Sequence, residues 1–161
     1  VKKKYKKHKD NILEVDEIDG FSMLINKKKF NDGDYFDENI FLYLENNDLC
    51  LRTKKRGENI YIIKNSLIDH LGGASADPDF SLEIEYLRNW HWMWSKFYYH
   101  KKHFGYIFAL FKMFRHILSA FFKYFFYSVS GNLKKKIFYK ARLDGCINAL
   151  LLKKSWYRPK I

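Results

Sequence analysis

The chain of 161 residues has little cysteine, and its start lacks the features of a secreted protein. Cys50 and Cys146 are its two cysteines, with no CxxC motif and no histidine pair at metal-ligand spacing beside them, so a reducing, cytosolic compartment is expected. The first residues, Val1 followed by three lysines, contain neither an initiator methionine nor the apolar stretch of a secretory signal. We therefore expect a fragment whose true N-terminus is missing.

Acidic residues almost disappear after Leu87. Residues 1–87 hold 14 Lys and Arg against 17 Asp and Glu, a net charge of −3, whereas residues 88–161 hold 16 against the single Asp144, a net charge of +15. The two halves give the total of +12. Because this basic half is interleaved with many of the 15 Phe and 12 Tyr residues, it suits an anionic partner, either nucleic acid or an anionic membrane face.

Short apolar runs separated by turn residues organise the first half. The lysine-rich stretch Lys2–Lys9 is expected to be a solvated connector, and Lys27–Phe30 a short helical turn. Glu45–Arg56 has acids at its start, bases at its end and Gly57 after it, which predicts a helix. Short strands are predicted over Ile12–Ile18, Ile60–Ile63 and Leu67–Ile68.

Five separated elements between Val15 and Ser75 follow one another in a specific order. They are the run Gly20–Ile25, the triplet Phe36-Asp37-Glu38, the segment Phe41–Arg52, then Gly57, and finally His70 with Gly72-Gly73-Ala74-Ser75. This order resembles the C-terminal half of the catalytic domain of family 2 glycosyltransferases, in particular the bacterial members that build O-antigen and other surface polysaccharides. The resemblance implies an α/β fold, with a partial GT-A domain over 1–78 and an amphipathic, α-helical, membrane-associating region over 79–161.

The resemblance also implies an activity. It is the inverting, metal-assisted transfer of a sugar from a nucleotide-sugar donor to a lipid-linked or saccharide acceptor, by a peripheral protein on the cytoplasmic face of the inner membrane. The divalent metal, Mg²⁺ or Mn²⁺, is expected to be held mostly by the nucleotide-binding half of the domain. That half is missing, since no strand-and-glycine nucleotide site opens the chain, so this chain alone is not expected to hold the donor.

Inverting transfer needs a carboxylate that takes the proton of the acceptor hydroxyl. The family's usual base position is occupied here by Asn46, an amide that cannot accept a proton at neutral pH. Three alternatives remain open: Glu45 is the base, the acid comes from elsewhere, or the protein is a weakened paralogue. Asp48 joins Glu45 as a catalytic candidate that positions the acceptor, although both residues also suit a helix-capping pair.

The remaining candidate residues follow in the chain. Arg52 lies four residues after Asp48, which predicts an intrahelical ion pair, and it is assigned to substrate binding together with Gly72 and Gly73. The resemblance makes His70 a metal ligand, while a structural histidine and a bare glycine turn are the alternatives.

Apolar periodicity predicts three helices in the second half, over 79–103, 104–129 and 133–152. Residues 104–129 are long enough to span a bilayer, but 14 apolar residues supply roughly −6 kcal/mol, whereas the three cations Lys112, Arg115 and Lys123 cost roughly +9 kcal/mol. Polar residues recur at helical spacing and leave a wide aromatic face: Lys112, Arg115, His116, Ser119, Lys123 and Tyr127. The pattern favours a helix lying on an anionic membrane surface, with a soluble helical bundle as the alternative.

Two other functions compete with sugar transfer. The charge and the aromatic residues of the second half would also suit a nucleic-acid-binding module. The chain contains no recognised nucleic-acid motif, and its aromatic residues follow helical faces instead of alternating along strands, so we do not expect a nucleic-acid partner. A non-catalytic, membrane-associated relative is the third possibility, and Asn46 is its only support.

Overall fold

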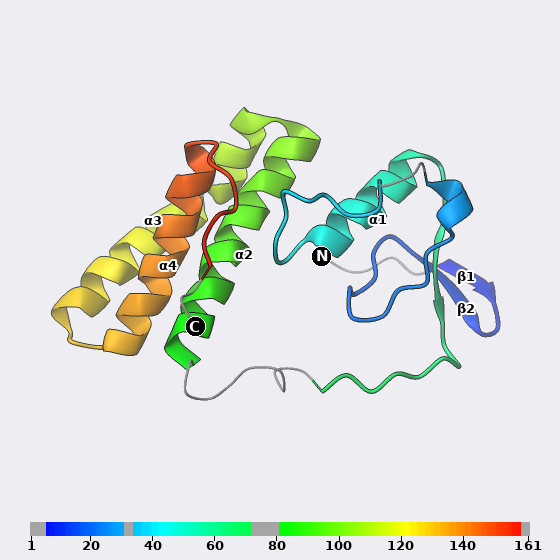
Figure 1. Ribbon diagram of the computed structural model, residues 1–161, viewed down its shortest axis with the longest axis horizontal. Coiled ribbons are helices and arrows are strands. Elements are labelled where there is room, and N and C mark those ends of the chain that lie inside the picture. Colours follow the sequence, from blue (N-terminus) through cyan, green and yellow to red (C-terminus); the bar gives the residue numbers. More distant parts are fainter. Residues whose placement is uncertain (1–5, 31–33, 72–80, 159–161) are drawn as a thin grey trace. The chain divides into compact units, whose positions relative to one another are not determined.

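The computed structural model describes residues 6–30, 34–71 and 81–158, and its contacts divide the chain into two compact units (Figure 1). The first unit consists of Val1–Glu38 and Leu44–Gly72. The second consists of Asn39–Tyr43 and Gly73–Ile161, so a five-residue segment from the first half packs with the C-terminal helices.

The first unit is built on a small antiparallel sheet with the strand order β1-β2-β3. Strand β1 (Lys6–Lys9) pairs with β2 (Ile12–Val15), which pairs with β3 (Ile60–Ile63) so that Ile12 faces Ile63 and Val15 faces Ile60. The 3-10 helix η1 (Lys27–Lys29) and helix α1 (Glu45–Lys55) complete the unit. Its buried core is small: Val15 and Ile60 from the sheet and Cys50 from α1.

Three helices form the second unit: α2 (Ser81–Phe104), α3 (Tyr106–Val129) and α4 (Leu133–Leu150). Glycines separate them, because Gly105 and Gly131 have φ angles of 90° and 72° that other residues rarely adopt. Asn132 then caps α4, since its side-chain oxygen accepts a hydrogen bond from the backbone N–H of Lys135 at 3.1 Å.

The core of the second unit lies where the three helices meet. Its buried residues are Trp90, Met93, Trp94 and Phe97 from α2, Ala109 and Met113 from α3, and Ala141, Cys146 and Ala149 from α4. Gly145 allows the closest approach, since a Cβ atom there would lie 2.2 Å from the backbone oxygen of Trp90. Helix α4 therefore packs backbone to backbone on α2 at this point.

The segment after α4 returns along α2 and is held by buried hydrogen bonds. The indole N–H of Trp94 donates to the backbone oxygen of Lys153 at 3.0 Å. His91 is fully buried, with Nε2 2.9 Å from the backbone oxygen of Tyr157 and Nδ1 3.0 Å from the hydroxyl of Ser155. Because a carbonyl only accepts, Nε2 carries the proton and Nδ1 accepts from Ser155. Burial lowers the pKa of His91 to about 4, so the ring is neutral.

The predicted fold class is wrong. Most residues that the structure describes are helical, and the sheet consists of three antiparallel strands of four residues each, which is not the mixed α/β sheet of a GT-A domain. One predicted strand, Leu67–Ile68, has no strand partner and is exposed. An apolar run predicts a strand only if another strand is available to pair with it, and the pattern of one segment contains no information about its partner.

Individual elements follow the sequence pattern more closely. The predicted helices over 45–56, 79–103, 104–129 and 133–152 correspond to α1, α2, α3 and α4, and the helical turn corresponds to η1. The expected connector Lys2–Lys9 instead contains β1, whose backbone pairs with β2 despite its four basic residues. Over the described ranges, none of these helices combines the length and the apolar character that crossing a membrane requires.

Candidate active site

The backbone that leads into α1 is strained. Tyr43 and Leu44 have φ angles of 68° and 67°, a left-handed conformation that costs a residue with a side chain about 1–2 kcal/mol. Leu44 is the N-cap residue and supplies no side-chain hydrogen bond to the helix. Strain of this kind concentrates at functional sites, and here it turns the chain immediately before Glu45.

Glu45 is the first residue of α1 and has an unusual environment. Its Oε2 atom is shielded from solvent and has no hydrogen-bond partner among the described residues. Gly20 lies close to this end of α1, since a Cβ atom there would lie 3.6 Å from Oε1 of Glu45 and 3.3 Å from Cβ of Asn46. A buried carboxylate oxygen without a partner is costly to maintain, and it keeps lone pairs available to accept a proton.

Asn46 has a structural role that only an amide can fill. Its Nδ2 group donates a hydrogen bond to the backbone oxygen of Ile18 at 2.7 Å and so ties the Ile18–Gly20 turn to α1. An aspartate carboxylate at this position would face that carbonyl oxygen without a donor. The sequence shows that Asn46 replaces an acid, but it does not show this hydrogen bond. Gly20 is the residue whose small size allows the turn to pack closely against Asn46.

Asp48 and Arg52 form the ion pair that their spacing predicts. The side chain of Asp48 is 0% exposed, and its Oδ2 atom accepts from Nε of Arg52 at 2.8 Å. The other nitrogens of Arg52 donate to Oδ1 of Asp34 at 3.1 Å and to the backbone oxygen of Tyr35 at 2.5 Å. Arg52 therefore fastens the segment at Asp34 and Tyr35 to α1, and its predicted role in substrate binding stays a prediction.

His70 lies on the surface of the first unit. Its ring stacks on Phe21, with the centroids 4.8 Å apart and the planes within 5°. Gly72 and Gly73 lie outside the residues that the structure describes. Within those residues, no three His, Cys, Asp or Glu side chains gather into a group that could hold a metal ion. The described residues alone therefore do not form a site for Mg²⁺ or Mn²⁺.

Comparison with known proteins adds no relative to this description. No protein-family model, curated protein or solved structure matches the chain. A functional conclusion must therefore be drawn from the motif order in the sequence and from the geometry at the start of α1.

Proposed function

We propose that the protein takes part in glycosyl transfer, with Glu45 as the general base. The observation that carries the proposal is the Oε2 atom of Glu45, which is shielded from water and has no partner within the described part of the chain, at the point where the backbone is strained. The order of motifs around Glu45, which resembles family 2 glycosyltransferases, supports the same activity. The proposal rests on this site and not on a GT-A sheet.

The proposed chemistry uses the carboxylate of Glu45. A hydroxyl of a lipid-linked or saccharide acceptor gives its proton to Glu45 as its oxygen attacks the anomeric carbon of a nucleotide-sugar donor, and the nucleoside diphosphate leaves with the bonding electrons. Asp48 and Arg52 hold the first turns of α1, and Asn46 holds the adjacent turn, so that the carboxylate of Glu45 stays in place.

Glu45→Gln tests the proposal in the intact protein, because the amide has nearly the same shape but cannot take the proton. We expect turnover in a nucleotide-sugar transfer assay to fall by about 10² or more, with donor affinity little changed. Glu83→Gln is the matched control, since Glu83 is exposed and lies outside the motifs between Val15 and Ser75. Equal turnover in the wild type and Glu45→Gln would contradict the assignment.

We further propose that α3 holds the protein on an anionic membrane surface, without crossing it. The side of α3 away from the core of its unit carries large exposed apolar residues: Ile107, Phe111, Phe114, Phe121, Phe122, Phe125, Phe126 and Val129. Phe111 is 80% exposed. An apolar surface of this extent is typical of an interaction site, and aromatic side chains suit the boundary between lipid headgroups and acyl chains.

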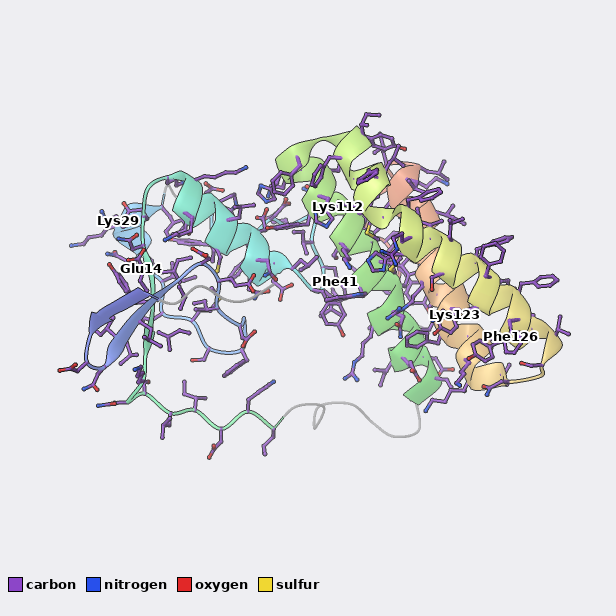
Figure 2. The ribbon with its side chains drawn as sticks, turned by 180° about the vertical axis from the view of Figure 1, so that it is seen from behind. Glu14, Lys29, Phe41, Lys112, Lys123 and Phe126 are labelled. Atoms are coloured by element: carbon purple, nitrogen blue, oxygen red, sulfur yellow. The ribbon has the colours of Figure 1, made fainter. Side chains whose placement is uncertain are left out.

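Charge selects the anionic membrane as the partner of this face. Lys112, Arg115 and Lys123 lie along the same helix, and Figure 2 labels the first and the last of them. The part of the chain from Arg88 onward contains a single acid. The ammonium group of Lys112 lies 5.5 Å from the ring centroid of Phe108, so cation and aromatic ring meet at the edge of the apolar face. Each such cation near an anionic leaflet contributes about 1 kcal/mol to binding.

Flotation with vesicles tests the membrane proposal. Vesicles of phosphatidylcholine with phosphatidylserine should carry the protein, and the double variant Phe111→Ser, Phe125→Ser should reduce the bound fraction about tenfold or more, since two exposed aromatic anchors are lost. Ser119→Ala on the same helix is the control. Two results would contradict the proposal: protease protection of a segment inside sealed vesicles, or a stable dimer in solution that the double variant dissociates while vesicle binding is unchanged.

A further inference from the structure

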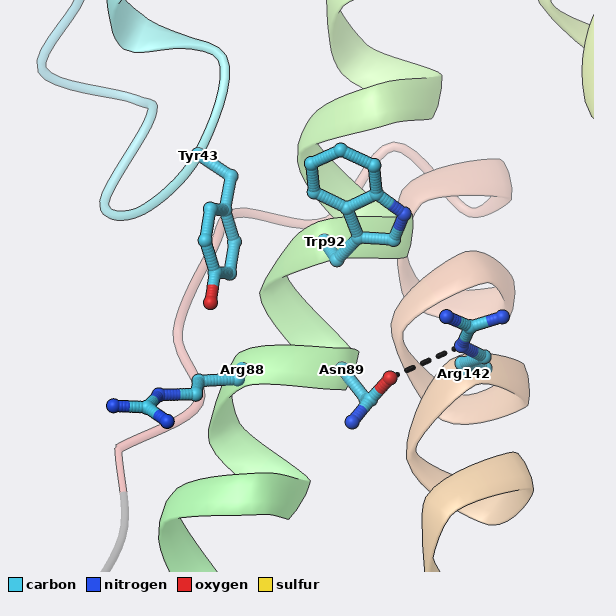
Figure 3. A pocket seen from close by; sticks show the side chains of 5 residues that line it. All are labelled: Tyr43, Arg88, Asn89, Trp92 and Arg142. Carbon is cyan, nitrogen blue, oxygen red and sulfur yellow. Dashed lines mark hydrogen bonds between the residues drawn. The ribbon is translucent and has the colours of Figure 1, made fainter. Parts of the chain in front are cut away.

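The helical unit contains an open pocket of about 310 Å³ that the proposed function does not use. It is lined by Tyr43, Arg88, Asn89, Trp92 and Arg142, all within the second unit (Figure 3). Two of the five residues are arginines, two are aromatic and none is acidic. The pocket therefore presents cations beside flat aromatic surfaces.

Arg142 is held in place and keeps donors available. Its Nε group donates to Oδ1 of Asn89 at 3.0 Å, while the Nδ2 group of Asn89 donates to the backbone oxygen of Glu85 at 2.9 Å (Figure 3). The guanidinium also lies 4.4 Å from the ring centroid of Phe138. Within the described part of the chain, the terminal nitrogens of Arg142 have no acceptor, so four N–H donors are aimed by a fixed side chain.

Lys96 lies near Arg142, and within the described residues neither of the two side chains forms an ion pair with a carboxylate. Lys96 follows Trp92 by one helical turn, and its ammonium group lies 6.0 Å from the Trp92 ring centroid and donates to Nε2 of His116 at 3.0 Å. The pKa of Lys96 is lowered, mainly by burial and secondly by the charge of Arg142. Burial also lowers the pKa of Arg142 itself. Like charges crowded in a half-buried place are stabilised when an anion joins them.

We propose that this pocket binds a phosphate ester, with Arg142 and Arg88 as its charged ligands and Asn89 as the residue that positions Arg142. The two terminal nitrogens at the end of a planar guanidinium match the oxygens of phosphate, and Trp92 and Tyr43 provide an apolar wall for the group esterified to it. The site takes either a phosphorylated lipid headgroup or a soluble phosphate compound. It does not depend on Glu45 or on sugar transfer.

Titration of the full chain with inorganic diphosphate, followed by calorimetry, tests the site directly. We expect saturable binding that weakens about 10-fold or more in Arg142→Gln and in Arg88→Gln, because each loses a charge-assisted contact. Arg88 is exposed and makes no contact in the core, so its variant remains informative if Arg142→Gln perturbs α4. Lys153→Gln removes the same charge from an exposed position outside the pocket and should change binding less than about 2-fold.

Vesicles then distinguish the two sources of phosphate. If the lipid is the source, phosphatidylcholine vesicles with phosphatidic acid should bind more protein than vesicles with phosphatidylserine of equal charge, and Arg142→Gln should remove this preference. Diphosphate binding without that preference assigns the pocket to a soluble phosphate compound. No saturable diphosphate binding, or equal weakening in Arg142→Gln, Arg88→Gln and Lys153→Gln, would overturn the proposal, whatever the transfer activity of Glu45→Gln.

Discussion

Among the described residues, the cluster of buried apolar residues in the unit built on the small sheet has three members, whereas the cluster in the helical unit has nine. In the first unit, ion pairs between side chains also connect segments that the small core does not hold together. Lys54 reaches Glu14 at 3.2 Å, Lys29 reaches Glu58 at 3.0 Å, and Arg52 joins Asp48 to the segment at Asp34. The first unit also leaves apolar residues of β3 exposed, among them Ile63.

The contrast separates two tasks in one chain. Directional contacts fix individual side chains, which a catalytic carboxylate such as Glu45 needs, but they contribute little stability when exposed. Apolar packing supplies stability and leaves the surface free to carry charge and aromatic rings, which suits binding to anionic partners. Changes that act on one unit and not on the other test this separation.

Asp48→Ala should have the largest effect on stability, and only in the first unit. The substitution leaves Arg52, which is 14% exposed, without its buried partner, and breaking such a pair costs about 3–5 kcal/mol. Hydrogen exchange measured by mass spectrometry should show loss of protection over α1. Protection in α2 and α4 should not change.

Glu17→Ala provides the comparison for Asp48→Ala. The carboxylate of Glu17 accepts one exposed hydrogen bond from Asn47 at 2.8 Å, which is worth less than about 1 kcal/mol. If Asp48→Ala also removed protection from α2 and α4, the two units would unfold together and the separation would be wrong.

Acid should destabilise the helical unit through His91. The pKa of His91 is about 4 in the folded protein, against about 6.5 for an ordinary histidine, so the unfolded chain binds the proton first as the pH falls. The stabilisation is complete above about pH 6.5 and is lost toward pH 4, a change of about 3 kcal/mol. Urea unfolding at several pH values, followed by tryptophan fluorescence, measures this change in the helical unit, which contains all four tryptophans.

His91→Gln should flatten that pH profile while lowering stability at pH 7, where the hydrogen bonds to Tyr157 and Ser155 are lost. The pKa values of His100 and His116 are also lowered, mainly by burial, so part of the acid dependence remains in the variant. If the unfolding free energy of His91→Gln changed with pH as steeply as that of the wild type, protonation of His91 would not destabilise the folded protein.

Gly145→Ala should destabilise the helical unit by about 2–3 kcal/mol. The new methyl group would lie 2.2 Å from the backbone oxygen of Trp90, so α4 has to move away from α2. Urea unfolding should shift to a lower midpoint, whereas Ser119→Ala on the exposed side of α3 should shift it little. A midpoint for Gly145→Ala equal to that of the wild type would mean that the helices are not in backbone contact.

Local sequence patterns predicted the helices well, but they predicted less well which strands pair with one another. Gly57 follows α1 where the sequence indicated, and the spacing of Asp48 and Arg52 predicted their ion pair, because both depend on neighbours within a few residues. Strands depend on partners far away in the chain. The four basic residues of β1 suggested a connector, although β2 supplies the hydrogen bonds that make a strand.

The candidate site divides in the same way. Glu45 was identified from its motif, but its unpaired oxygen, the strain at Leu44 and the tie from Asn46 to Ile18 depend on the course of the backbone. The pocket lined by Arg88 and Arg142 joins residues 54 positions apart on two helices, and no local pattern connects them. Sequence alone assigned their charge to a broad basic half.

The smallest effect we predict concerns single cations on α3. Arg115→Gln or Lys123→Gln should each weaken binding to phosphatidylserine vesicles about 5-fold at low salt, since one cation near the leaflet contributes about 1 kcal/mol. Both side chains are exposed on the helix that carries the aromatic face. Lys28→Gln in the first unit removes the same charge and should weaken binding less than 2-fold. Raising the salt concentration should shrink these differences, because screening shortens the reach of each charge to about 8 Å at 0.15 M. Equal losses in all three variants would mean that the net charge of the whole chain attracts the membrane, and the division of tasks between the units would not extend to membrane binding.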